Sequence, residues 1–391
     1  MVAVWPRRLA LVVAPAYSES FASWVDRMAL RNGCPPRAMV EALGLDVRAA
    51  SDVRSLAYGV VTTLETCRAI EAATGVSSET VRGMHLEVFD GSVLDLAGVR
   101  VGDEESVRRA EGREWVRFFG SRVCPTCLAA SGGVWLTWWK LSWAAVCPEH
   151  RTLLVDLCPR CRVAVRRGPA GQPARLSRSR MPAPLRCGAL LSGAVCDQPI
   201  PQIRTSVASH ELADQQQLVL EVATRRRPAL IAGQVVNAGQ WFAVLKATAL
   251  LARLGVPEVL PLLDAPPNSQ DALAAEAGGQ RWNRAGPVGR FGMAPRTALV
   301  AAGLLATASK VAAAEEESEL VARLMPLATA ARMRWKERRP DLSTPMALPP
   351  VFTAALDAVS PSAGRRRGAA RRRGRSVPTG RMRRCGRARW S

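Results

Sequence analysis

Cysteine spacing is the feature that most constrains the fold of this 391-residue chain. Seven of its ten cysteines lie between Cys124 and Cys196, mostly in pairs with two residues between them, and His150, one of only three histidines, stands among them. Cysteines in a secreted protein indicate disulfides, whereas this paired spacing beside a histidine indicates metal ligands in a reducing compartment. We therefore expect a cytoplasmic protein whose middle region is built around metal ions.

Two sets of four ligands can be assembled from these residues. The first joins the knuckle Cys124-Pro-Thr-Cys127 to the knuckle Cys147-Pro-Glu-His150, with 19 residues between them, as in a zinc ribbon or finger. The second is less regular, because its closing pair has eight intervening residues; its members are Cys158, Cys161, Cys187 and Cys196. A set of four protein ligands leaves no open position, so we expect about two zinc ions, both structural.

Other cysteine chemistry fits this pattern less well. A single C-x2-C pair is typical of a thioredoxin-like redox site, but three such knuckles within 40 residues, each containing a proline, are typical of metal binding. Cys147 and His150 would make a poor nucleophile and base, since no acid nearby orients the histidine. We predict no catalytic residue and no enzymatic activity, and we expect the remaining thiols to be free: Cys34, Cys67 and Cys385.

Four of the eleven tryptophans lie between the two knuckles of the first set: Trp135, Trp138, Trp139 and Trp143. Such a cluster could stack on nucleic-acid bases. A small ribbon has little core of its own, however, and packs rings of this kind against a neighbouring helix. We expect these side chains to be buried.

The N-terminal region reads as helical. From Ser18 the apolar residues Phe21, Trp24, Val25 and Met28 recur at the spacing of one helix face, so Trp24 is expected in the core. Arg27, on the same helix, either pairs with an acid inside the domain or presents its charge to a partner. Two further short helices are predicted over 37–43 and 61–74.

Residues 62–86 have the spacing of a helix-turn-helix, with the tight turn at Gly75 and the second helix capped by Ser77. An ordinary helical hairpin fits the pattern equally well. In the first interpretation the second helix points Ser78, Arg82 and His85 outward, and these are the predicted nucleic-acid contacts.

Charge patterning points to a polyanionic partner. The chain has 54 Lys and Arg against 33 Asp and Glu, for a net charge of +21. The last 28 residues contain 12 arginines and no acid, so this tail is expected to be disordered when free and to contact phosphates. The contacts predicted there are Arg365, Arg366, Arg367, Arg371, Arg372 and Arg373.

The whole pattern predicts a mostly α protein with small zinc-ribbon β elements. The expected units are an N-terminal helical module over 1–115, tandem zinc ribbons over 116–200, a C-terminal all-α domain over 201–360 and the arginine tail over 361–391. Outside the first module we expect a helix over 107–119, a loop or β-ribbon over 163–184, and further helices over 210–225, 229–254 with a break near Gly239, and 297–325.

Several segments together resemble the TniQ family of transposition proteins. They follow in the family's order and approximate spacing over residues 1–165: Leu11-Val12-Val13-Ala14-Pro15, ESFASWVDRMA from Glu19 to Ala29, Val123-Cys124-Pro125-Thr126-Cys127-Leu128, WAAVCPEH from Trp143 to His150, Leu153-Leu154-Val155-Asp156 and Cys158-Pro159-Arg160-Cys161. The resemblance implies that the N-terminal segment, which mimics a twin-arginine signal at Arg7-Arg8, is retained. Two features depart from the family pattern: Glu71 replaces the usual small residue, and the arginine tail has no counterpart.

The resemblance implies a non-catalytic accessory factor of transposition. Such proteins pair a helix-turn-helix with zinc ribbons and help select or engage the target, by binding DNA or by joining an RNA-guided complex. The implied partners are DNA, a transposase and an AAA+ ATPase of the same element, with a homodimer left open, in a bacterial cytoplasm at the nucleoid. The alternative is a free-standing, zinc-containing transcriptional regulator, and a redox enzyme is a third hypothesis. No membrane span is expected, because the longest uncharged apolar run, 297–309, is too short.

Overall fold

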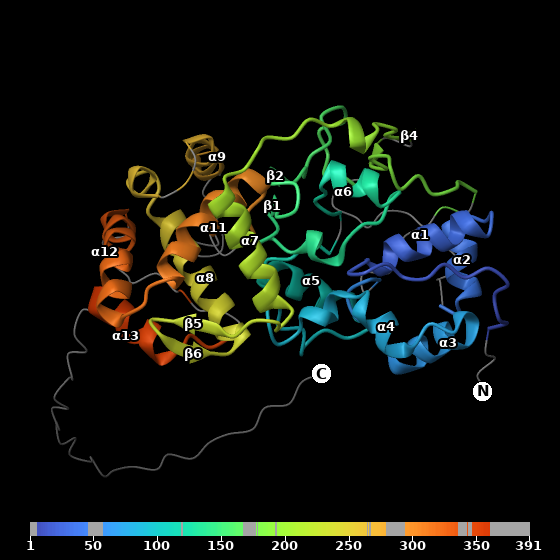
Figure 1. The fold of residues 1–391 in the computed structure, drawn as a ribbon, viewed down its shortest axis with the longest axis horizontal. Coiled ribbons are helices and arrows are strands. Elements are labelled where there is room, and N and C mark those ends of the chain that lie inside the picture. The colour runs from blue at the N-terminus through green and yellow to red at the C-terminus, as the bar shows by residue number, and fades with distance from the viewer. Residues whose placement is uncertain are drawn as a thin grey trace, which may run out of the picture.

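The computed structural model describes residues 6–45, 58–118, 120–166, 177, 179–191, 194–263, 265, 267–278, 294–334, 342 and 346–359. Helices at the two ends of the chain form two groups, and the knuckle region lies between them (Figure 1). The strands in the described residues form three two-stranded antiparallel sheets. The predicted mostly α class with small β elements is confirmed. Across these same residues, no helix combines the length and the apolar character that crossing a membrane requires.

The N-terminal group has its own small core. Its helices are α1 (Phe21–Arg31), α2 (Pro36–Ala42), α3 (Leu64–Thr74) and α4 (Ser78–Gly83). The predicted apolar stripe of α1 is buried, and the indole nitrogen of Trp24 donates a hydrogen bond to the carbonyl of Val13 at 2.8 Å. Arg27 pairs with the buried carboxylate of Glu19 at 2.5 Å, so the structure places its charge inside the domain.

The middle region consists of short elements joined by long connections. They are α5 (Glu104–Arg113), α6 (Pro125–Ala130), β1 (Val146–Cys147), β2 (Thr152–Leu153), β3 (Leu190–Leu191) and β4 (Ala194–Val195), with 3-10 turns η1 (Leu86–Phe89), η2 (Thr137–Lys140) and η4 (Ile200–Gln202). The helix predicted over 107–119 begins earlier, because the Asp103 side chain caps it by accepting from the amides of Glu105 and Ser106. All four tryptophans of the cluster are buried, so the packing expectation is confirmed.

The C-terminal group consists of helices packed around α8 and α11. Its elements are α7 (His210–Ala223), β5 (Ala229–Ile231), β6 (Gln234–Val236), α8 (Ala238–Leu254), the 3-10 turn η5 (Leu260–Leu262), α9 (Pro267–Gly278), α11 (Ala298–Ala312), α12 (Glu317–Arg334) and α13 (Pro350–Val359). Helix α11 packs against α7, α8, α9 and α12, and α13 packs against α12. Helix α7 crosses the middle of the face seen in Figure 1.

Two helix predictions in this group were wrong in part. Residues 229–236 form the hairpin β5–β6 instead of the start of a helix, because Ala232 (φ 48°) and Gly233 (φ 72°) form a left-handed turn. A capping box between Asn237 and Gln240 then starts α8. The helix predicted over 297–325 is divided into α11 and α12. The Glu319 side chain accepts from the amide of Glu315, and this contact marks the beginning of α12.

Arg122 joins the middle region to the C-terminal group. Its guanidinium is fully buried and donates to the carbonyls of Ser142 and Ala144 at 2.8 and 2.6 Å. It also donates to the carbonyls of Pro295 and Thr297, at the start of α11. One continuous apolar core extends from residue 60 to residue 359, so the knuckle region and the C-terminal helices share it.

We predict that Arg122→Met destabilises the protein by about 3–5 kcal/mol, because four buried carbonyls lose their donor. Arg108→Met is the matched control, since that side chain is 62% exposed on α5, and it should change stability by less than about 0.5 kcal/mol. Urea unfolding of both variants measures the difference. Equal unfolding midpoints for the two variants would contradict the role assigned to Arg122.

Candidate metal centres and nucleic-acid interface

The first predicted ligand set comes together between α6 and the hairpin β1–β2. Cys124 precedes α6 and Cys127 lies within it, while Cys147 ends β1 and His150 lies in the turn to β2. The Cys127 Sγ lies 3.5 Å from the Cys147 Sγ. The His150 Nδ1 lies 3.2 to 3.7 Å from the three sulfur atoms.

The second set is equally compact. The Cys158 and Cys196 sulfur atoms are 3.7 Å apart, and those of Cys161 and Cys187 are 3.8 Å apart. The irregular spacing between Cys187 and Cys196 has a simple cause, because the residues between them include the hairpin β3–β4, which brings its two ends together. The amide of Gly188 donates to the carbonyl of Cys196 at 3.0 Å across this hairpin.

Both sets have the dimensions of a tetrahedral zinc site. Four ligand atoms at zinc–sulfur distances of about 2.3 Å lie about 3.8 Å from one another, and a zinc–nitrogen bond shortens the sulfur–nitrogen distances to about 3.5 Å. In each set all four ligand atoms lie within 4.8 Å of one another. Thiolate and imidazole ligands in this arrangement favour zinc over the hard cations. The residues present therefore fit a structural zinc ion in each set.

The knuckle that contains Cys147 and the knuckle that contains Cys158 adopt the same kind of backbone turn. In each, the residue after the second ligand is an arginine in the left-handed region: Arg151 has φ 50° and Arg162 has φ 60°. Their amides donate to the carbonyls of Cys147 and Cys158, each at 2.8 Å. This conformation is costly for a residue with a Cβ, so the turn is imposed by the ligand geometry rather than by local preference.

The three thiols of the first set hydrogen-bond to one another. Hydrogen bonds from the Cys127 and Cys147 thiols lower the pKa of Cys124, and the same contact with Cys124 raises the pKa of Cys127. In the second set burial raises the pKa of Cys187, because a buried thiolate lacks a compensating charge. The described cysteines form no disulfide, so Cys34 and Cys67 are free thiols as predicted, and Cys385 lies outside the described residues.

The predicted helix-turn-helix segment folds as two helices around a left-handed turn. Gly75 has φ 74°, and the Ser77 hydroxyl accepts from the amide of Thr80 at 3.2 Å, so both the turn and the cap are confirmed. The second helix is short, since α4 has only six residues. The Ser78 hydroxyl donates to Glu71 at 2.6 Å, which gives that unexpected acid a structural partner.

Of the side chains predicted to face outward here, Arg82 does so and His85 does not. Arg82 keeps 60% of its side chain exposed while its Nε contacts Glu87 at 3.2 Å. His85 is buried and stacks on Phe21, and its Nδ1 bonds to the carbonyl of Val81 at 2.9 Å. Its predicted surface position was wrong because α4 ends at Gly83 and the chain turns inward.

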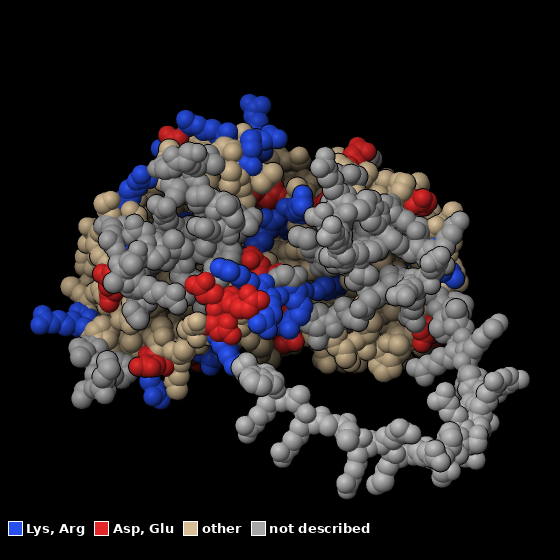
Figure 2. Space-filling view, turned by 180° about the vertical axis from the view of Figure 1, so that it is seen from behind, with Lys and Arg blue, Asp and Glu red and all other residues tan. Residues whose placement is uncertain are grey.

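Several basic residues elsewhere on the surface lie next to acids. Figure 2 shows Lys and Arg side by side with Asp and Glu near the middle of that face. On α5, for example, Arg108 and Arg109 lie next to Glu104 and Glu105, at 3.4 and 3.2 Å. The predicted tail contacts between Arg365 and Arg373 lie outside the described residues. A third basic group, Arg225 to Arg227 after α7, was missed, although three consecutive arginines after a helix are visible in the sequence.

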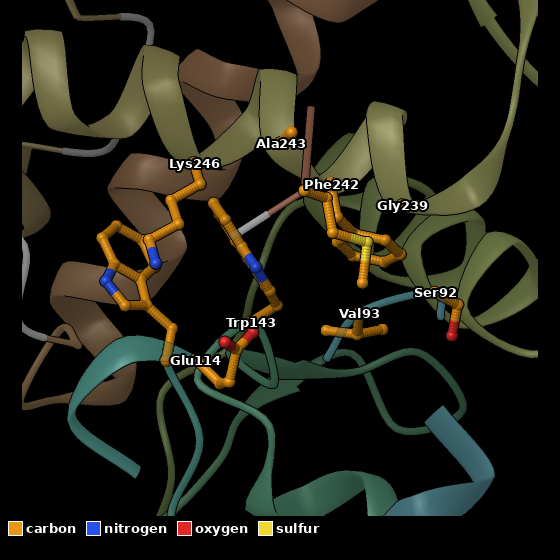
Figure 3. A pocket seen from close by; sticks show the side chains of 10 residues that line it. Ser92, Val93, Glu114, Trp143, Gly239, Phe242, Ala243 and Lys246 are labelled. Carbon is orange, nitrogen blue, oxygen red and sulfur yellow. The ribbon is translucent and has the colours of Figure 1, made fainter. Parts of the chain in front are cut away.

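A small cavity between α5 and α8 is lined by the half-buried Lys246 and the buried carboxylate of Glu114 (Figure 3). Burial lowers the pKa of Lys246 to about 8 and raises that of Glu114. Lys246 donates to the carbonyl of Arg113 at 2.5 Å, and Glu114 accepts from the amide of Asp95. The cavity measures about 20 Å³, which holds about one water molecule, so it is too small for an organic substrate.

The chain matches the model of the TniQ family over residues 10–154. The chain carries a TniQ domain. The domain contains the N-terminal helices, the tryptophan cluster, Arg122 and the whole first ligand set, whereas the second ligand set begins just beyond it. No curated protein matches the chain.

We predict that the purified protein holds two zinc ions. Cys127→Ser should remove the ion of the first set and unfold the TniQ domain, because hydroxyl is a poor zinc ligand and the knuckle has little core of its own. Cys161→Ser should remove only the other ion. Zinc content by mass spectrometry and thermal melting measure both effects, and Cys34→Ser, at a half-buried free thiol, is the control. A full zinc content in the Cys127 variant would disprove the first set.

We predict that His85 makes the fold sensitive to mild acid. Burial lowers its pKa from 6.5 to about 4, so between these values only the unfolded chain binds the proton. The free energy of unfolding therefore keeps its full contribution from neutral His85 above pH 6.5, and it decreases as the pH falls from 6.5 toward 4. Between pH 7.5 and 5.5 the wild type should lose about 1 kcal/mol more than His85→Gln. Urea unfolding at the two pH values measures this, and identical losses in both proteins would contradict it.

Proposed function

We propose that the chain is a DNA-binding accessory protein of transposition that helps to select the target and connects a transposase and an AAA+ ATPase to it. The observation that carries the proposal is the TniQ domain over residues 10–154. The proposal assigns no catalysis to the chain, and both metal sets are given a structural role because each supplies four protein ligands.

The helix pair α3–α4 supports direct contact with DNA. Its second helix begins at a capped N-terminus and carries the exposed guanidinium of Arg82, which can donate to a guanine edge or to a phosphate. Ser78, which is half-buried, lies in the first turn of the same helix. The same helix pair favours the second candidate, a free-standing zinc-containing transcriptional regulator.

We predict that two basic elements contribute differently to DNA binding. Deleting residues 364–391 should remove most of the salt dependence of DNA affinity, since arginine runs neutralise phosphates. On duplex DNA each neutralised phosphate contributes about 0.9 to the slope of log K against log salt concentration. Sequence preference should survive the deletion. If the Arg82 side chain contacts a base, Arg82→Ala should reduce the sequence preference at one base pair. If it contacts a phosphate, the variant should bind all DNA sequences more weakly by the same factor.

Binding titrations on a randomised duplex library at several salt concentrations measure both effects. Arg109→Ala, at an exposed and ion-paired position on α5, is the matched control. An Arg82 variant indistinguishable from this control would exclude α4 as a DNA contact. Pull-down of the transposase and the ATPase encoded beside this chain tests the bridging role, and regulation of a neighbouring promoter without such partners would favour the regulator.

A further inference from the structure

Tyr17 is presented to solvent by a rigid turn. Its side chain is 77% exposed, in contrast to the buried aromatic rings of the tryptophan cluster. The next residue, Ser18, has φ 56°, and its carbonyl accepts from the amide of Thr137 at 2.8 Å. The amide of Glu19 donates to the carbonyl of Ala16, which closes the turn. The ring therefore contributes little to the core, yet the backbone holds it in a fixed place.

Three exposed arginines follow α7 beside this ring. The guanidinium of Arg226 lies 5.9 Å from the centre of the Tyr17 ring, and its Nε donates to the Thr224 hydroxyl at 2.9 Å. Within the part of the chain that the structure describes, no carboxylate lies within ion-pair distance of Arg226. Arg225 donates to a backbone carbonyl, that of Asp90, at 2.6 Å. Of the three, and counting only described residues, Arg227 alone forms an ion pair, with Glu221 at 3.6 Å.

This group lies next to the segment that follows α4. The Ser92 hydroxyl donates to the carbonyl of Ala223 at 2.8 Å, and together with the contact between Arg225 and Asp90 it fixes the end of α7 against residues 90–92. We name Tyr17 and Arg225 to Arg227 the Tyr17–arginine surface. It combines an open aromatic face with positive charge that is largely unneutralised.

We propose that the Tyr17–arginine surface binds an unpaired strand of nucleic acid, with one base stacked on Tyr17 and the flanking phosphates on Arg225 and Arg226. An aromatic ring beside guanidinium groups recognises base faces and phosphates without regard to sequence, and base faces are open only in an unpaired strand. Single-stranded DNA and RNA share this chemistry. The inference rests on the proposed function and deepens it, because it assigns a second contact that duplex binding by α4 does not require.

The test uses the full zinc-loaded chain and three fluorescent ligands of one length, about 20 nucleotides, in anisotropy titrations: oligo-dT, oligo-U and a DNA duplex. Tyr17→Ala should weaken oligo-dT or oligo-U binding about ten-fold and leave duplex binding unchanged, while Tyr17→Phe should keep wild-type affinity. Arg226→Gln should lower the salt slope on the single strand by about 0.7. The oligonucleotide, oligo-dT or oligo-U, that loses more affinity in Tyr17→Ala shows whether the bound strand is DNA or RNA. Val207→Ala, at another exposed position, is the control.

A second measurement is independent of the arginine tail. Photocrosslinking with an oligonucleotide that carries 5-iodo-deoxyuridine should yield a crosslinked peptide that contains Tyr17. If duplex binds but Tyr17→Ala leaves single-strand affinity unchanged, this inference is overturned and the proposed function stands. An equal loss on duplex and single strand also overturns it, because stacking on an unpaired base predicts a difference. If no nucleic acid binds, the proposed function and this inference both fail.

Discussion

The buried guanidinium of Arg122 is the interaction on which the architecture depends. An uncompensated charge in a core is costly, and here four backbone carbonyls from two distant segments compensate it, together with the nearby carboxylates of Asp156 and Glu276. Those carbonyls belong to the residues on either side of Trp143 and to the start of α11. The part of the TniQ domain from Val60 onward shares a continuous core with the C-terminal helices. A second polar link comes from Gln216 of α7, whose side-chain oxygen accepts from the amides of Ala145 and Val146.

The two ligand sets lie in a part of the chain that has little regular secondary structure. Between α6 and α7 the regular structure amounts to pairs of two-residue strands and short turns, which bury too little to hold their own shape. A metal ion held by each ligand set would fix these turns by coordination, and Trp139 packs in the same continuous core as Cys124 and Cys147. Trp135 links this region to the N-terminal helices, since its amide donates to the Ser23 hydroxyl and its carbonyl accepts from the amide of Ser20.

The surface that this framework presents has two distinct parts. The pair α3–α4 offers a short helix with one exposed guanidinium, Arg82. The Tyr17–arginine surface joins residues more than 200 positions apart in the sequence, and the contact of Arg225 with Asp90 links it to the segment after α4. A protein that engages a target could thus contact a duplex and an unpaired strand from neighbouring elements.

The sequence by itself determined which cysteines and histidine gather in two groups, the apolar stripe of α1, the Gly75 turn and the TniQ domain, because spacing and local chemistry carry these features. It did not determine that His85 turns inward, that 229–236 is a hairpin or that Arg27 pairs with Glu19, because these depend on where each helix ends and what packs beside it. The role of Arg122 and the meeting of Tyr17 with Arg226 were decided only by tertiary structure. Contacts between residues so distant in the chain leave no periodicity that a sequence can show.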